Sequence, residues 1–120
     1  MINQLINPSS KTTLRLALAD TFFKRFLGYM GRKPIQPDQG MLFTLAHPSK
    51  MDASIHMFFM RFDIAVIWLS EELTVVDKTI ARRWRPAYVP SRPAKYILET
   101  HLSQIDNFSL QDRVELVYAS

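Results

Sequence analysis

The stretch Ser54–Leu69, S-I-H-M-F-F-M-R-F-D-I-A-V-I-W-L, decides the fold of this chain. It is an almost continuous apolar run in which the strongly polar residues are His56, Arg61 and Asp63. Neither alternation nor a helical period separates an inner from an outer face, and this is typical of strands buried on both faces. We therefore predict two consecutive buried strands, at residues 55–60 and 63–69.

The three ionisable residues of this run are the first candidates for a site. Burying an unpaired charge costs roughly several kcal/mol, so each group needs a partner or a place at the mouth of a cleft. Asp63 is either a carboxylate that binds a ligand or one half of a buried ion pair with Arg25 or Arg61. We expect an arginine of the segment Arg25–Arg32 to approach the strand that carries Asp63.

His56 has two interpretations. It could act as a general base or hydrogen-bonding group in a cleft. The alternative, which we favour, is a core histidine bonded to a backbone carbonyl. His47 and His101 share no metal-binding spacing with it, so the sequence predicts no metal site.

Composition sets the class of protein. The 120 residues, of which 48% are hydrophobic and 22% charged, are typical of one soluble globular domain spanning residues 1–120. We expect residues 1–11 to be a loosely ordered N-terminal segment. The start of the chain lacks the pattern of a signal peptide, and no apolar run is long enough to cross a membrane. The default expectation is a cytoplasmic protein without a membrane partner.

The sequence carries no motif of known chemistry. It contains no cysteine, which excludes disulfides, thiol nucleophiles and thiolate-bound metals. A glycine-rich phosphate loop, a nucleophile elbow and a pair of catalytic carboxylates are also missing. We therefore expect no cofactor and no catalytic residue that the sequence can identify.

Strand signals dominate the rest of the chain. Residues 12–19 alternate cleanly, and Asp20 is a suitable N-cap for a short helix over residues 21–30. Further strands are expected at 41–46, 73–80, 95–100 and 113–118, with a turn of helix near 102–108. The predicted fold is α+β and predominantly β: a compact, barrel-like curled sheet of six to seven short strands with one short helix near the N-terminus.

The loop between Arg82 and Arg92 concentrates positive charge around Trp84 and Arg85. Pro86, Pro90 and Pro93 limit its freedom, so it can be held ready at a low entropic cost. We predict that it forms part of the rim of a pocket or interface. The alternative of equal weight is that Trp84 closes one end of the sheet while the arginines are solvated. A net charge of +4 gives little support for nucleic-acid binding.

Five motifs in order resemble the family catalogued as domain of unknown function 192. They are R-F-L-G-Y-M-G-R (25–32), G-M-L-F (40–43), the run around I-H-M-F-F-M-R-F-D-I, P-A-K-Y-I-L-E (93–99) and D-R-V (112–114). The motif residues are Arg25, Gly28, Met30, Gly31, Arg32, Gly40, Met41, Phe43, His56, Met60, Asp63 and Glu99. Gln111 replaces the glycine that the family has in its last turn. The resemblance implies a small β-rich, barrel-like fold and supplies no accepted activity.

Three functions remain open. The first, which we favour, is a non-enzymatic module that binds a small molecule or a protein through a polar cluster in an apolar cleft. The second is a small enzyme with His56 as general base and Asp63 as its orienting partner. The third is a weak nucleic-acid binder that uses the Arg82–Arg92 loop. The predicted binding residues are Arg25, Arg32, His56, Arg61, Asp63, Trp84 and Arg85.

Overall fold

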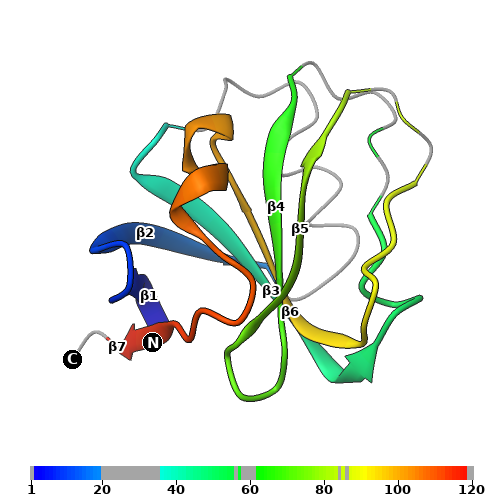
Figure 1. Ribbon diagram of the computed structural model, residues 1–120, viewed down its shortest axis with the longest axis horizontal. Helices are drawn as coiled ribbons and strands as arrows, with labels where there is room; N and C mark the ends of the chain where they lie inside the picture. The colour runs from blue at the N-terminus through cyan, green and yellow to red at the C-terminus, as the bar shows by residue number, and fades with distance from the viewer. Residues whose placement is uncertain are drawn as a thin grey trace.

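The computed structural model describes residues 2–19, 36–55, 57, 62–83, 85 and 87–118. This part of the chain is mostly β-strand (Figure 1). The elements are β1 (Ile2–Asn7), β2 (Thr12–Ala19), β3 (Gln39–Ser49), β4 (Ile64–Leu69), β5 (Val75–Ala81), β6 (Ala94–Thr100), the 3-10 helix η1 (Leu102–Asn107) and β7 (Glu115–Tyr118). All seven strands form one mixed sheet in the order β5-β4-β6-β3-β2-β1-β7.

Strand β4 is buried on both faces, as the apolar run predicts. All six of its residues are buried, and it pairs antiparallel with β5 on one side and β6 on the other. One face carries Val66 and Trp68 into what we call the first core, which also contains Phe43 and Ile97. The opposite face carries Ile67 and Leu69 into the second core, which contains Leu5, Leu14 and Phe108.

The pairing of β2 with β3 is parallel, whereas the other strand pairs of the described sheet are antiparallel. Parallel neighbours require a crossover connection. The connecting residues 20–35, with the predicted helix at 21–30, lie outside the described residues.

Our expectation for the N-terminal segment is wrong, because Ile2–Asn7 forms strand β1 between β2 and β7. The sequence did not indicate this strand, because polar residues interrupt its apolar pattern and its partner β7 lies at the other end of the sequence. Its inward-facing Leu5 and Asn7 are fully buried. The amide of Asn7 donates to the carbonyl of Asn107 at 2.8 Å and to the carboxylate of Asp112 at 3.0 Å, so this buried polar group is satisfied.

The sheet is open, with β5 and β7 at its edges, and a barrel-like form is not confirmed. Among the described residues, the two edges meet where β5 begins. There Thr74 and Arg113 form an isolated bridge, and the Val114 N–H donates to the Leu73 carbonyl at 2.9 Å. Residues Ser70–Leu73 form the turn that connects β4 to β5, so the β5 segment does not continue alongside β7. The strand β7 therefore extends past its contact with that segment.

The backbone groups of successive residues in β7 point alternately towards β1 and away from it, and this determines which of them face outward. Val114 donates away from β1, towards Leu73. Successive residues of a strand direct their N–H and C=O groups to opposite sides. The groups of Glu115 and Val117 therefore face β1, and those of Leu116 and Tyr118 face away from it. The pairing on the other side of β1 agrees. The Arg15 N–H of β2 donates to the Asp38 carbonyl, away from β1, so the backbone groups of Leu14 face β1 and its partner Leu5. The groups of Leu5 then face β2, and those of its other partner, Leu116, face away from β1.

This parity predicts an alternating pattern of hydrogen exchange along β7. The amides of Glu115 and Val117 should exchange slowly, because they donate to β1, while the Leu116 amide should exchange much faster. Residue-resolved hydrogen–deuterium exchange by NMR measures the three rates. Equal protection of Leu116 and Val117 would contradict the assignment.

The last turn provides a second prediction, because Gln111 has a φ of 76°, in the left-handed region that favours glycine. This left-handed conformation costs a side-chain-bearing residue roughly 1–2 kcal/mol. Glycine avoids that cost but loses more chain entropy on folding. Gln111→Gly should therefore raise the free energy of unfolding by about 0.5–1 kcal/mol, and Gln111→Ala should not raise it. Urea denaturation of both variants provides the comparison, and stabilisation by alanine alone would show that φ is not the cause.

Candidate functional site

Asp63 lies immediately before β4 and is the centre of a polar cluster. Its Oδ1 accepts the backbone N–H of Arg83 at 2.7 Å. Its Oδ2 lies 3.3 Å from Nη1 of Arg82. The side chain of Asp63 is 19% exposed and that of Arg82 is 60% exposed, so the ion pair lies at the surface of the core.

Asp63 has a partner that we did not predict, Arg82. Arg25 and Arg61, the expected partners, lie outside the described residues, as does Arg32. The cation that Asp63 contacts in the described part belongs to the loop after β5. Antiparallel pairing explains this, because Ile64 is opposite Ala81 and the hairpin brings the residue before β4 next to the residue after β5.

Hydrogen bonds hold the loop after β5 in place. The backbone N–H of Arg82 donates to the hydroxyl of Tyr88 at 2.7 Å. Tyr88 and Ile55 exchange backbone hydrogen bonds of 2.8 and 2.9 Å, and Met57 donates to the carbonyl of Arg85 at 2.9 Å. In the described part of the predicted strand 55–60, Ile55 forms only this isolated bridge. These bonds fix the loop at several points of its backbone.

The underside of the loop rests on the first core. Tyr88 is half-buried and packs against that cluster. Trp68 is 1% exposed, and its ring N–H donates to the carbonyl of Ala53 at 2.8 Å. This bond joins the chain before Ile55 to β4. The loop is thus supported by well-packed strands, as precise binding surfaces require.

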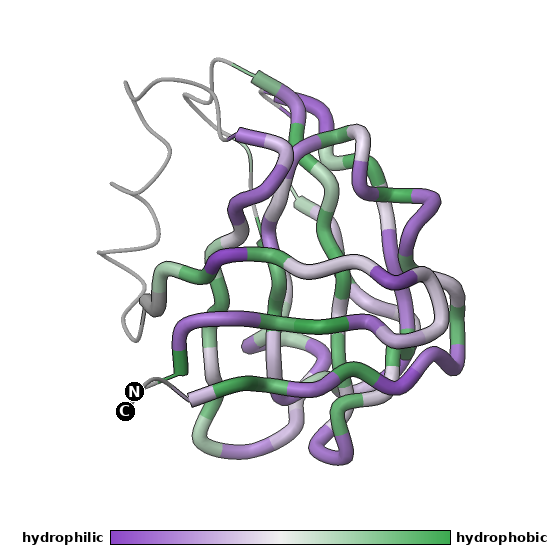
Figure 2. Tube along the Cα trace, turned by 90° about the vertical axis from the view of Figure 1, so that its left-hand side faces the viewer, coloured by the Kyte–Doolittle hydropathy of each residue, from purple (hydrophilic) through white to green (hydrophobic). Residues whose placement is uncertain are grey.

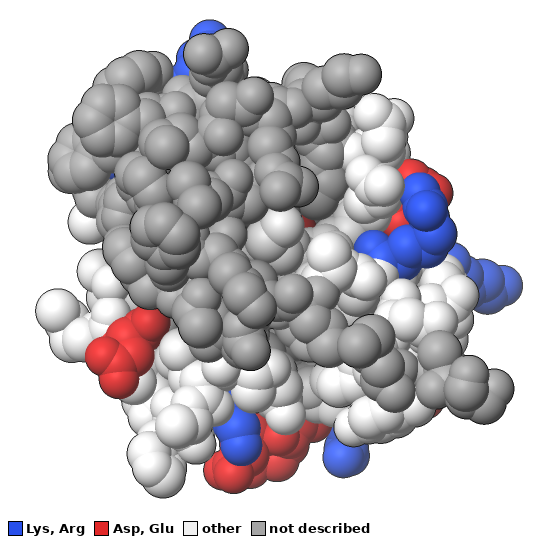
Figure 3. Space-filling model, turned by 180° about the vertical axis from the view of Figure 1, so that it is seen from behind, with Lys and Arg blue, Asp and Glu red and all other residues white. Residues whose placement is uncertain are grey.

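Arginine side chains project from the supported loop. Arg83, Arg85 and Arg92 are exposed, and no ion pair with a described residue involves them. Val89 is 47% exposed in the same segment. In Figure 3, which shows the molecule from behind, basic atoms lie beside acidic atoms at the right-hand margin, which is the side of β1 and β2 and is opposite to this loop in Figure 1. We call the described residues 82, 83, 85 and 87–92 the arginine loop.

Two predicted residues of this region cannot be placed. Trp84 and His56 lie outside the described residues, so the role of Trp84 as rim or plug stays a prediction. Arg85 is exposed on the arginine loop, as a rim residue should be.

Glu99 is one of the motif residues of the family resemblance, but we did not count it among the predicted binding residues. This side chain of β6 is 4% exposed, and it is the only ionisable side chain buried within the described part of the chain. It lies in register between Met41 of β3 and Val66 of β4, on the first-core face. The available signal was a single carboxylate in an otherwise apolar strand, within the motif P-A-K-Y-I-L-E.

The electrostatics of Asp63 suit a structural anchor. The backbone N–H of Arg83, and then the guanidinium of Arg82, hold the pKa of Asp63 below its ordinary value of 3.8, against the opposing effect of burial. The carboxylate is therefore charged at neutral pH and already accepts two donors. Within the described residues, no group of three or more His, Asp or Glu side chains could hold a metal ion.

Comparison with known proteins gives a consistent picture. The profile of the DUF192 family, described as an uncharacterized group, matches residues 5–116. A UPF0127 protein of Pyrococcus furiosus is 40% identical over 112 residues, which are 92% of this chain and 93% of the relative. A UPF0127 protein of Thermococcus sibiricus is 44% identical over 105 residues, 86% of this chain and 66% of the relative. This chain spans almost all of the first relative and slightly less than two thirds of the second.

Two crystal structures have the same fold. One, from Sinorhizobium meliloti 1021, is of a protein provisionally described as a transcription regulator. It aligns with a TM-score of 0.79 and 23% identity, over 94% of this chain and 90% of its own. The other, of a protein of unknown function from Novosphingobium aromaticivorans, aligns with a TM-score of 0.80 and 20% identity, over 93% and 81%. No helix among the described residues is long and apolar enough to cross a bilayer.

The anchoring role of Asp63 is open to a direct test. Asp63→Ala removes the acceptor of the Arg83 N–H and should lower the free energy of unfolding by about 1–3 kcal/mol near neutral pH. Because the folded-state pKa is depressed, this stabilisation exists above the unfolded pKa of 3.8 and is lost as the pH falls through the lower folded value.

Urea denaturation near neutral pH and well below pH 3.8 separates charge from packing. The difference between wild type and Asp63→Asn should shrink in acid. Asp106→Asn, at an exposed position of η1, is the matched control and should show little change at either pH. A pH-independent effect of Asp63→Asn would mean that its charge does not stabilise the fold.

Proposed function

Because the chain belongs to the DUF192 family, for which no activity is described, we propose a function from its own geometry: it is a non-enzymatic module that binds an acidic partner through the arginine loop. The observation that carries the proposal is that Arg83, Arg85 and Arg92 are exposed, without an ion pair to any described residue, on a loop whose backbone is fixed. Exposed guanidinium groups on a rigid support suit carboxylate and phosphate recognition.

The second supporting argument is preorganisation. The Arg83 N–H is bound to Asp63, the Arg82 N–H to Tyr88, and the Ser91 N–H to Asp77 at 2.8 Å. A partner that binds such a loop does not have to order it, so less of the contact energy is lost. Exposed Val89 adds an apolar contact between the charged groups.

The state of Asp63 favours binding over catalysis. In the alternative, a small enzyme, Asp63 would orient the imidazole of His56. Both oxygens of Asp63 already accept donors from the loop, namely the Arg83 N–H and the Arg82 guanidinium. A carboxylate engaged in this way supports the loop and has less capacity to position a base.

The test uses hexaglutamate as an acidic probe and fluorescence anisotropy as the readout. The triple variant Arg83→Gln, Arg85→Gln, Arg92→Gln should bind about three- to hundredfold more weakly, because each of the three exposed pairs contributes roughly 0.2–1 kcal/mol. Binding by the wild type should weaken as salt is raised.

A matched triple variant distinguishes a site from general attraction. Lys11→Gln, Arg15→Gln, Lys50→Gln removes the same charge from other exposed positions and should leave the affinity within about twofold. Equal losses in both triple variants would contradict the proposal. Tighter binding of a single-stranded oligonucleotide than of hexaglutamate would favour the nucleic-acid alternative. Turnover in a hydrolase and isomerase panel that is abolished by His56→Ala would favour the enzyme.

A further inference from the structure

The two edges of the sheet are protected to different degrees. Along β5, the Asp77 carboxylate accepts the Ser91 N–H at 2.8 Å, and the Lys78 ammonium donates to the Ile105 carbonyl of η1 at 2.9 Å. At the start of β5, Val75 exchanges backbone bonds with Asp112 and Gln111. The loop before β6, η1 and the last turn thus cover the β5 edge.

The β7 edge has no such cover from the described residues. Alternation leaves the backbone groups of Leu116 and Tyr118 facing away from β1, and no described strand pairs with them. The side chain of Tyr118 is 69% exposed. Natural edge strands are protected by their shortness, by charged side chains such as lysine, by proline or by a bulge. β7 is short, with 4 residues, and its charged residue is Glu115. The sequence Glu115-Leu116-Val117-Tyr118 contains neither lysine nor proline.

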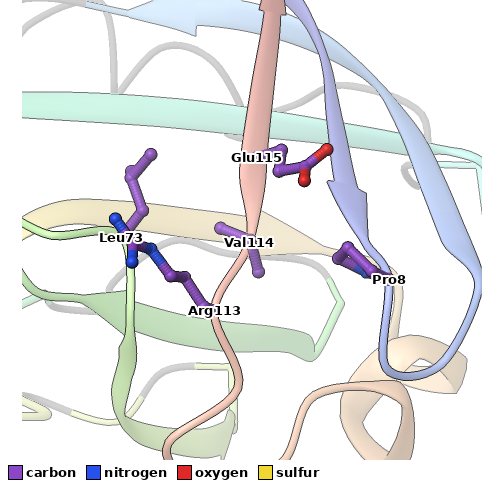
Figure 4. Close-up of a pocket in the computed structure, with 5 residues that line it drawn as sticks. All are labelled: Pro8, Leu73, Arg113, Val114 and Glu115. Carbon is purple, nitrogen blue, oxygen red and sulfur yellow. The ribbon is translucent and has the colours of Figure 1, made fainter.

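A cavity of about 550 Å³ lies where β7 begins. It is lined by Pro8, Leu73, Arg113, Val114 and Glu115, which Figure 4 shows on both sides of the strand. Leu73 has a φ of 65°, a left-handed conformation that is uncommon for a non-glycine residue and is found more often at functional positions. An open strand edge beside a pocket for one side chain is the arrangement by which a sheet recognises an extended peptide.

We propose that the open edge of β7 binds an extended segment of another protein, which adds an antiparallel strand next to Leu116 and Tyr118 and places an apolar side chain in the cavity beside Leu73 and Val114. This inference is independent of the arginine loop. It rests on the hydrogen-bond parity of β7, the cavity and the charges that flank the cavity.

The charges at the cavity define the occupant. Arg113 and Glu115 are exposed, lie on one face of the strand two residues apart, and form no ion pair with described residues. The added strand can extend only to the residue opposite Glu115, because Leu73 and Thr74 already lie opposite Val114 and Arg113. A complementary segment therefore carries a basic residue opposite Glu115 and leaves the sheet there, with an apolar residue for the cavity followed by an acidic residue that reaches Arg113. Opposite charges across a strand pair stabilise it, and like charges destabilise it.

A second copy of this chain fits the edge less well. If two β7 strands paired about Leu116, the Glu115 carboxylates of the two copies would become diagonal neighbours and repel each other. If they paired about Val117, neither Arg113 nor Glu115 would meet an opposite charge. The charge pattern therefore favours a different protein as the partner.

The experiment titrates the full chain with the hexapeptide Thr-Thr-Val-Lys-Leu-Glu and follows backbone amides by NMR. The amides of Leu116 and Tyr118 should shift, and the exchange of the Leu116 amide should slow. The charge-swapped peptide Thr-Thr-Val-Glu-Leu-Lys should bind about three- to tenfold more weakly. The double variant Arg113→Glu, Glu115→Arg should reverse that preference.

A proline variant separates strand addition from side-chain contact. Tyr118→Pro removes one outward donor without removing a bond to β1, so it should weaken peptide binding. Tyr118→Ala, which keeps the donor, should bind more strongly than Tyr118→Pro. Equal affinity of the two variants, no preference between the two peptides, or shifts confined to other strands would overturn the proposal. Self-association with slow Leu116 exchange in the absence of peptide would identify a second copy as the occupant and would also overturn it.

Discussion

The burial of β4 on both faces is the constraint on which the rest of the structure depends. Its six residues supply side chains alternately to the first and the second core, so both faces of the sheet need a cover. A strand of this kind cannot lie at an edge, and β5 and β6 pair with it on either side. The same strand fixes Asp63 at its start and, through Trp68, the chain at Ala53. The polar cluster and the support of the arginine loop both follow from its position.

The sequence predicted β4 and its neighbouring strands well, because a long apolar run and clean alternation are local signals. The β4–β5 hairpin, strands β2 and β6 and the helical turn η1 were read from such signals and are present. The parallel pairing of β2 with β3 and the strand β1 were not predicted. Both depend on partners far away in the sequence, and in β1 only Leu5 and Asn7 are fully buried, which leaves almost no pattern to read.

For the candidate site, the sequence singled out Asp63 but did not predict its contact with Arg82. Asp63 stands out because it interrupts an apolar run, whereas its pairing with Arg82 depends on the register of β4 with β5. Glu99 had the same local signal as Asp63, a lone carboxylate in a strand, but it came at the end of a shorter apolar segment. Contacts across a sheet are set by register, and register is not encoded in any single segment.

The neighbouring positions of β1 and β7 have a mechanical consequence. Ile2 at the start of β1 is opposite Tyr118 at the end of β7, and Figure 2 shows the two ends of the chain close together. A force that pulls these ends apart acts across the strand pair and not along it, so it loads the hydrogen bonds one after another. The pair should open like a zipper at low force, beginning at Tyr118 and moving towards Glu115. The interior pairs around β4 would carry no load until that opening is complete.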